Sequence, residues 1–202
     1  MTVVLATRNR RKIDELERIL VGPRVAVRTL EDFPGCPEVR EEGTTFEANA
    51  ATKALAVARY TGQPALADDS GLEVEALGGA PGVRSARYAG EEADDQANVA
   101  KLLEALREVP DGARRARFVC VVALALPDGR VETFRGTVEG SVGREPRGSA
   151  GFGYDPVFYP LGERRTFAEM RDDEKDAVSH RGRALRAARR RLTEGRPGEE
   201  SA

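Results

Sequence analysis

Apolar and polar positions along the N-terminal third of the chain alternate in the manner of an α/β protein. The apolar run 2–6 predicts a buried strand, and Ile13, Leu16 and Leu20 then recur at the spacing of a helix. Residues 25–29 predict a second strand. The polar turn between the first strand and the helix would leave free N–H groups at the helix start, a place suited to an anion.

A second helix is predicted by a capping box of Thr44 and Glu47, and it should run to about Tyr60. Between the second strand and this helix, residues 31–43 form a loop rich in proline and acidic side chains. The predicted buried face of the helix consists of Phe46, Ala50, Ala54, Val57 and Ala58.

The C-terminal half continues the same alternation. Residues 94–109 predict a helix, and residues 114–126 and 130–142 predict two strands joined by a hairpin at Asp128-Gly129. A final helix is expected from about Asp172 to Leu192. With no internal repeat or linker, we expect one domain over residues 1–193 and a disordered polar tail over residues 194–202.

Composition narrows the class of protein. The 202 residues include 32 Lys and Arg against 34 Asp and Glu, so no global field attracts nucleic acid or an anionic membrane. No apolar stretch reaches the roughly 18 residues of a membrane span. Cys36 and Cys120 lack CxxC spacing, which is typical of reduced thiols in a cytosol. We therefore expect a cytoplasmic globular protein without a nucleic-acid or membrane partner.

The segment Asp68-Asp69-Ser70-Gly71 carries the clearest chemical signal. It follows a short apolar run and ends in glycine, which predicts that a buried strand delivers these side chains at its C-terminal tip, where α/β sheets bind ligands. Adjacent strand residues point to opposite faces, so only one of the two aspartates can enter a given site. Oxygen ligands of this kind suit Mg²⁺. The alternative is an ordinary turn, in which Asp, Ser and Gly are common for local reasons.

Lysine is rare in this chain, which prefers arginine as its surface cation. The scarcity suggests that individual lysines are needed as compact point charges, the form suited to a phosphate oxygen. A single histidine is more often a surface or packing residue than a catalyst. The residues in question are Lys12, Lys53, Lys101, Lys175 and His180.

Common catalytic and phosphate-binding motifs are absent from the sequence. It contains no GxxxxGK[ST], no GxGxxG and no GxSxG, so it predicts neither a P-loop, a dinucleotide fold nor a serine hydrolase. Polar turns with acids and isolated lysines remain, and these suit metal-assisted chemistry on a phosphate ester.

Five segments in order resemble the inosine triphosphate pyrophosphatase family, the XTP/dITP diphosphatases. They are the T-x-N-x-x-K turn from Thr7 to Lys12, EGTTFEANAATKA, ADDSGLEVEALGGAPGVRSARYAG, GFGYDPVF and EKDAVSHR. The resemblance implies Mg²⁺-dependent hydrolysis of ITP, dITP and XTP to the monophosphate and pyrophosphate, which cleanses the nucleotide pool. It also implies a homodimer, and a mixed central sheet with flanking helices in two lobes with a cleft between them.

The same resemblance assigns roles at the phosphate end. Asp69 would be metal ligand and proton acceptor, with Ser70 as a substrate contact and Glu41 as the second carboxylate on the metal. Glu38 and Glu42 compete with Glu41, and Asp68 would point away and hold the turn. The phosphate chain would be bound by Thr7, Asn9, Lys12 and Lys53.

Two points at this end stay open. Thr7 and Asn9 could instead simply cap the helix. The residue after the threonine is commonly small in the family, whereas here it is Arg8, in a run with Arg10 and Arg11. Arg8 either points outward, which we favour, or adds a phosphate contact.

The base would be recognised by the C-terminal motifs. Phe152, followed by Gly153 and Tyr154, would stack on the purine, and Asp155 would accept from the ring N1–H. Donors toward the 6-oxo group would come from Lys175, His180 and Arg181. The alternative places these cations on a solvated basic helix face, which we accept for the arginines after Arg181.

Two other classes of function remain open on the sequence. One is a nucleotide-binding or sensing module without turnover. The other is a nucleic-acid binder that uses the basic C-terminal helix, although the balanced charge and few aromatic residues argue against it.

Overall fold

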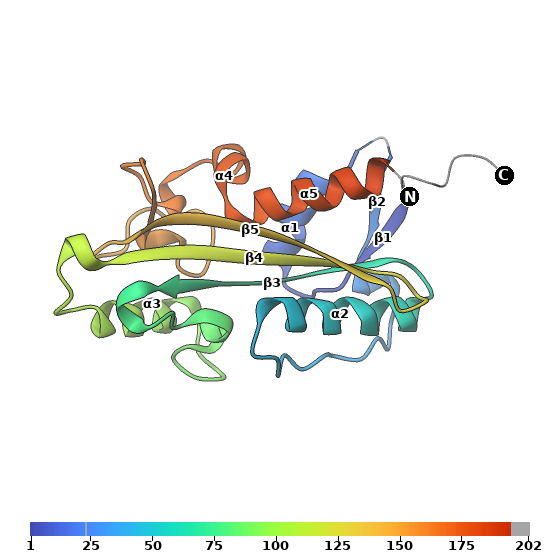
Figure 1. Ribbon diagram of the computed structural model, residues 1–202, viewed down its shortest axis with the longest axis horizontal. Coiled ribbons are helices and arrows are strands. Elements are labelled where there is room, and N and C mark those ends of the chain that lie inside the picture. Colours follow the sequence, from blue (N-terminus) through green and yellow to red (C-terminus); the bar gives the residue numbers. More distant parts are fainter. Residues whose placement is uncertain (23, 195–202) are drawn as a thin grey trace. The chain divides into compact units, whose positions relative to one another are not determined.

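A computed structural model describes residues 1–22 and 24–194 and confirms the mixed α/β fold (Figure 1). Within these described residues, six strands form one sheet in the order β2-β1-β3-β4-β5-β6. β1 is parallel to both of its neighbours, whereas β5 and β6 are antiparallel. Of the tail predicted over residues 194–202, all but Glu194 lies outside the described residues.

The chain divides into two compact units, and β3, β4 and β5 each contribute to both. Unit 1 comprises Met1–Asp69, Val121–Arg135 and the described residues from Arg181 on. Unit 2 comprises Ser70–Cys120 and Gly136–His180. The strands are β1 (Thr2–Leu5), β2 (Ala26–Arg28), β3 (Ala65–Val74), β4 (Arg115–Ala125), β5 (Val131–Val142) and β6 (Phe158–Pro160).

In unit 1, helix α2 covers one face of the strands, and α1 and α5 cover the other (Figure 1). Because both faces are covered, β1 and the start of β3 are nearly all apolar and buried, as parallel strands usually are. The predicted hairpin is confirmed: Gly129 adopts φ +95° and its N–H donates to the Leu126 carbonyl. The helices are α1 (Arg10–Leu20), α2 (Phe46–Thr61) and α5 (His180–Glu194).

Unit 2 has a core of its own, in which aromatic side chains are prominent. Phe118 packs edge-on against Phe158 with ring centroids 4.7 Å apart, and Phe167 lies against both. Such pairs contribute roughly 0.5–1.5 kcal/mol beyond their buried area. The helices of this unit are α3 (Asp95–Ala105) and α4 (Asp172–Val178), and the unit also contains short 3-10 segments that include Gly82–Arg87 and Asp155–Val157.

The start of α2 differs from the sequence prediction by one residue. Thr45, not Thr44, is the N-cap, and its side chain accepts from the Ala48 N–H at 3.1 Å. Glu47 pairs with Arg135 and so does not complete a capping box. The predicted apolar face is confirmed, since all five of its residues are buried.

The single helix predicted from Asp172 to Leu192 is wrong, because the chain breaks at Ser179. Ser179 has extended dihedrals (φ −67°, ψ 158°), and its N–H closes α4 by donating to the Lys175 carbonyl. Serine is favoured at the boundaries of helices, where its backbone leaves the helical region. The break ends α4 in unit 2 and starts a new helix that continues in unit 1.

No helix within the described residues combines the length and the apolar character needed to cross a membrane.

Candidate active site

The two aspartates lie in the middle of β3, so the prediction that they occupy a strand tip before a glycine turn is wrong. β3 continues through Gly71 to Val74. Charges are tolerated inside this strand because each carboxylate meets partners from other elements. Asp68 faces Lys12 and Arg181, while Asp69 faces Asn49 of α2. The prediction that Asp68 holds a turn is therefore also wrong.

Asp69 belongs to a group that we call the Lys53 cluster: Glu41, Asn49, Lys53 and Asp69. The Asn49 side-chain amide donates to Asp69 Oδ2 at 3.0 Å, and Asn49 Oδ1 accepts from the Gly43 N–H at 2.8 Å. A side chain at Gly43 would collide with Asn49. Asn49 thus ties the loop that carries Glu41 to the strand that carries Asp69.

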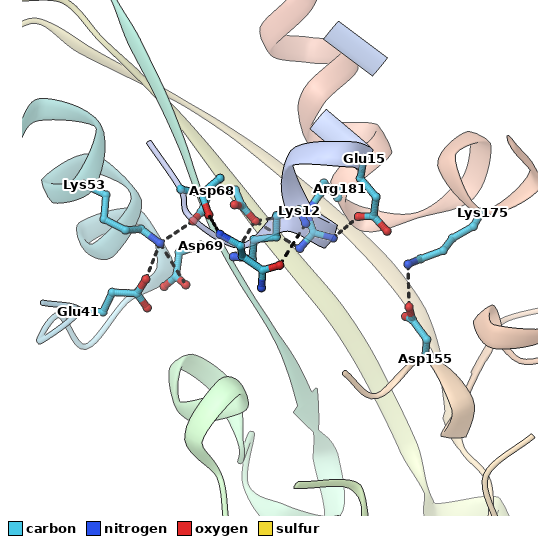
Figure 2. A network of polar contacts seen from close by, with 11 residues as sticks. Lys12, Glu15, Glu41, Lys53, Asp68, Asp69, Asp155, Lys175 and Arg181 are labelled. Atoms are coloured by element: carbon cyan, nitrogen blue, oxygen red, sulfur yellow. Dashed lines mark hydrogen bonds and ion pairs between the residues drawn. The ribbon is translucent and has the colours of Figure 1, made fainter. Parts of the chain in front are cut away.

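Lys53 is the centre of this cluster (Figure 2). Its ammonium lies 2.6 Å from Glu41 Oε1, 2.6 Å from the Asp68 carbonyl oxygen and 4.0 Å from Asp69 Oδ1. Burial disfavours the charge on Lys53, but the nearby carboxylates outweigh burial and raise its pKa. Burial raises the pKa of Asp69 to about 6, against the opposing effect of Lys53.

The cluster fits a hard divalent cation. Two carboxylates share one ammonium here, so negative charge exceeds positive charge at this point. Mg²⁺ is usually held by one or two carboxylates together with water and substrate phosphates. The described residues contain no group of three or more His, Cys, Asp or Glu that could hold a metal ion. Glu41 is the acid beside Lys53, whereas its competitors Glu38 and Glu42 are exposed.

The turn before α1 shows the capping that the sequence left as an alternative. Asn9 is the N-cap, its Oδ1 accepts from the Lys12 N–H, and Thr7 Oγ1 accepts from the Asn9 N–H at 3.2 Å. Arg8 is exposed and donates to the Cys36 carbonyl, and Arg10 pairs with Glu31. Arg11 is also exposed, so all three arginines of this run lie at the surface.

A second group, the Arg181 cluster, consists of Lys12, Glu15, Asp68 and Arg181 (Figure 2). Lys12 lies 3.1 Å from Asp68 Oδ2, and the Arg181 guanidinium spans Asp68 and Glu15. Burial opposes ionisation of Asp68, but Lys12 and Arg181 outweigh it and hold its pKa well below the usual range. Glu15 was missed by the sequence analysis, although an acid one turn after Lys12 on the apolar face of α1 was a usable signal.

In unit 2, Asp155 and Lys175 form a buried ion pair. Lys175 Nζ lies 2.7 Å from Asp155 Oδ2, which also accepts from the Phe152 N–H at 2.8 Å. The ammonium stands 5.0 Å from the centre of the Phe152 ring. Gly151 adopts φ +72° and approaches Asp155 so closely that a side chain there would collide with the carboxylate.

Further contacts fix the backbone around this pair. The Gly153 N–H donates to Asp95 Oδ2 at 3.0 Å, and the Tyr154 hydroxyl donates to the Ser85 carbonyl at 2.8 Å. Asp95 is another residue that the sequence analysis did not select. It lies in the first turn of α3, far from residue 153 in sequence, so local patterns could not reveal the contact.

His180 is buried and stacks on Phe118, with ring centroids 4.5 Å apart and an interplanar angle of 6°. The structure therefore brings Phe152, Asp155, Lys175 and His180 into unit 2, whereas the Arg181 contacts described above lie in unit 1. Ser70 follows Asp69 on β3 and is partly buried. The substrate roles of these residues stay predictions.

Comparison with known proteins identifies relatives over almost the whole chain. The model of the Ham1 family matches residues 3–191. A dITP/XTP pyrophosphatase of Desulforamulus reducens is 54% identical over 188 residues, covering 93% of this chain and 94% of that protein. A dITP/XTP pyrophosphatase of Geobacter sulfurreducens is 54% identical over 183 residues, covering 91% and 92%.

Solved structures agree with these matches. A HAM1 protein from Coxiella burnetii superposes with a TM-score of 0.88 at 44% identity, covering 96% of this chain and 100% of that one. The Ham1 protein of Staphylococcus aureus gives a TM-score of 0.86 at 40% identity, with 96% and 99% covered.

Proposed function

The chain belongs to the Ham1 family, and from this premise we propose that it is a nucleoside triphosphate pyrophosphatase. Its substrates are the non-standard purine nucleotides ITP, dITP and XTP, which it hydrolyses to the monophosphate and pyrophosphate. The relatives named dITP/XTP pyrophosphatase support this substrate class. The observation that carries the proposal is the Lys53 ammonium with the Glu41 and Asp69 carboxylates around it.

The phosphate chain is assigned to unit 1. Lys12 and Lys53 are compact cations that balance the charge of a triphosphate, and their effect grows as negative charge moves onto the leaving pyrophosphate. The Lys12 side chain is 17% exposed and the Lys53 side chain 12%, so both are largely shielded from water. Shielding strengthens their attraction to a phosphate oxygen. Thr7 and Asn9 supply a hydroxyl and an amide on the turn before α1, and Ser70 supplies a hydroxyl on β3.

Asp69 is assigned as the proton acceptor. Hydrolysis requires a water oxygen to bond to phosphorus while the bridging bond between the α- and β-phosphates breaks, and the water must lose a proton. A general base works best when its pKa lies near the operating pH. Burial raises the pKa of Asp69 to about 6, closer to neutrality than an exposed aspartate. Asn49 holds this carboxylate in place by its hydrogen bond to Oδ2.

A divalent cation, for which we propose Mg²⁺, would be held by Glu41 and Asp69. When bound it would neutralise phosphate oxygens and polarise the phosphorus under attack. Two carboxylates suit an ion that keeps water and phosphate ligands.

The base is assigned to unit 2. Asp155 accepts from the N1–H that hypoxanthine carries and adenine lacks, while Lys175 and His180 provide donors toward the 6-oxo group. An adenine 6-amino group would leave these polar groups unpaired, and such mismatches can reject a substrate by roughly 10⁴-fold. Lys175 supports the assignment because its ammonium is buried and fixed between Asp155 and the Phe152 ring.

We extend the proposal to a cytoplasmic homodimer, as the family resemblance implies. The balanced charge of the chain is compatible with a small-molecule substrate and gives no support to a nucleic-acid partner.

Turnover distinguishes this enzyme from a module that only binds nucleotides. Purified protein is incubated with ITP, XTP, dITP and ATP, each with Mg²⁺ or with excess chelator. We expect rapid hydrolysis of the first three, slow hydrolysis of ATP, and no reaction with chelator. Binding of ITP without product formation would contradict the proposal and support the sensing module.

A further inference from the structure

The Arg181 cluster has an arrangement that the proposed reaction does not yet use. Asp68 Oδ2 lies 3.1 Å from Lys12 Nζ. It also accepts hydrogen bonds from both Nε and Nη2 of Arg181, each at 3.3 Å. The remaining terminal nitrogen of Arg181, Nη1, donates to Glu15. Arg181 therefore joins the strand that carries Asp68 to the helix that carries Glu15 and Lys12.

All four side chains are shielded from water. The exposed fractions are 17% for Lys12, 8% for Glu15, 0% for Asp68 and 4% for Arg181. Burying charges is costly, and a well-packed apolar group often serves stability as well or better. Two cations and two anions nevertheless balance one another here, and Lys12 retains the largest exposed fraction of the four.

The geometry gives each charge a distinct part. Lys12 and Glu15 are three residues apart on α1, so they lie on the same face of that helix. Glu15 engages Arg181, which leaves Asp68 to serve Lys12 as well as Arg181. Without the Glu15 charge, two cations would compete for one carboxylate, and the planar fork of arginine is the stronger competitor.

We propose that Glu15 and Arg181 are positioning residues that orient Asp68 and, through it, the Lys12 ammonium that binds the phosphate chain. This inference rests on the proposed function, because it takes Lys12 as a phosphate contact. It also gives Arg181 a part at the phosphate end of the substrate, in place of the contact with the base expected from sequence.

A double-mutant cycle on phosphate binding tests the inference. Wild type, Glu15→Gln, Lys12→Met and the double variant are titrated with inorganic tripolyphosphate and Mg²⁺ in a calorimeter, so that neither a base nor turnover is needed. With Lys12 present, Glu15→Gln should weaken binding about tenfold, a coupling within the range of contacting residues. In the Lys12→Met background, Glu15→Gln only removes one negative charge, so tripolyphosphate should bind equally well or slightly more tightly.

The matched control is Asp14→Asn, which removes a carboxylate from an exposed neighbouring position on α1. It should not weaken binding in either background. If Glu15→Gln does not fold, the cycle is run with Arg181→Lys. This substitution keeps the positive charge but removes the planar guanidinium that contacts Asp68 and Glu15 together. In both variants, turnover of ITP and ATP should fall in the same proportion.

Equal effects of Glu15→Gln with and without Lys12 would overturn the inference, as would a wild type that does not bind tripolyphosphate. A narrowed ITP/ATP ratio in Arg181→Lys would also overturn it and assign Arg181 to the base. Pyrophosphate release from ITP by the wild type is scored separately. Its absence would overturn the proposed function, while the binding cycle would still decide the role of Glu15.

Discussion

Asp68 and Asp69 are adjacent in β3, yet their carboxylates face opposite sides of the strand, Asp68 toward Lys12 and Asp69 toward Asn49. The two environments shift the pKa values of the two carboxyl groups in opposite directions. Cations outweigh burial at Asp68 and lower its pKa, whereas burial raises the pKa of Asp69 to about 6. Neighbouring carboxyls separated in this way can hold different roles, one as a permanent charge and the other as a proton acceptor.

Asp69→Asn should lower kcat for ITP by at least about 10²-fold, the scale of a positioned acid–base group. The substitution keeps the shape of the side chain and removes its charge and basicity. Steady-state kinetics at saturating Mg²⁺ measure the effect. Glu73→Gln, which alters a partly exposed acid further along β3, is the control and should keep wild-type turnover. Turnover near wild type in Asp69→Asn would remove Asp69 from the mechanism.

Arginine should not replace lysine at Lys12, Lys53 or Lys175, because each ammonium fits a largely buried position beside a carboxylate. We expect losses in kcat/KM for ITP of about tenfold or more at each, a size common for contacts at an active site. Lys101 is exposed and donates to the Tyr88 carbonyl, so Lys101→Arg should be tolerated. Equal tolerance at all four positions would show that lysine scarcity carries no functional information.

His180→Ala should reduce selectivity. We expect kcat/KM for ITP to fall by an amount equivalent to about 1–3 kcal/mol of transition-state stabilisation, the size of a lost buried hydrogen bond. Activity toward ATP should change much less. The ring also stacks on Phe118, so thermal unfolding is measured in parallel. Phe118→Leu is the control, since it removes the stacking and keeps the imidazole. It should lower stability without narrowing the ITP/ATP ratio. Proportional loss of both substrates in His180→Ala would instead place His180 in catalysis or folding.

Stability in acid should depend on Asp68. Its folded pKa lies below the ordinary value of 3.8, so its stabilising contribution is present above that value and is lost as the pH falls. Between about pH 6 and pH 3, the wild type should lose roughly 1 kcal/mol more unfolding free energy than Asp68→Asn, which cannot bind the proton. Urea unfolding at the two pH values measures the difference. Identical losses would show that Asp68 is not held ionised by Lys12 and Arg181.

Sequence patterns predicted those helices and turns that are determined by residues close to one another in the sequence. The spacing of Ile13, Leu16 and Leu20 predicted α1 because burial of one helix face imposes that period. The hairpin at Asp128-Gly129 followed from turn chemistry. The family resemblance added the site residues, of which Glu41, Lys53 and Asp69 lie together.

What the sequence could not predict depends on partners far apart along the chain. The charge of Asp68 inside β3 is neutralised by Lys12 and by Arg181, and Arg181 lies 113 positions away along the chain. The break at Ser179 likewise separates Lys175 in α4 from Arg181 in α5, which the sequence analysis had placed on a single helix. Glu15 gained a role only through a guanidinium 166 positions away.

The products of ITP hydrolysis test the central claim most directly. ITP is converted to completion by the wild-type protein with Mg²⁺, and inosine monophosphate, inosine diphosphate, pyrophosphate and orthophosphate are measured separately. We predict one pyrophosphate for each monophosphate, with neither diphosphate nor orthophosphate formed. Orthophosphate together with inosine diphosphate would show cleavage at the terminal phosphate and contradict the assignment of this chain as a pyrophosphatase.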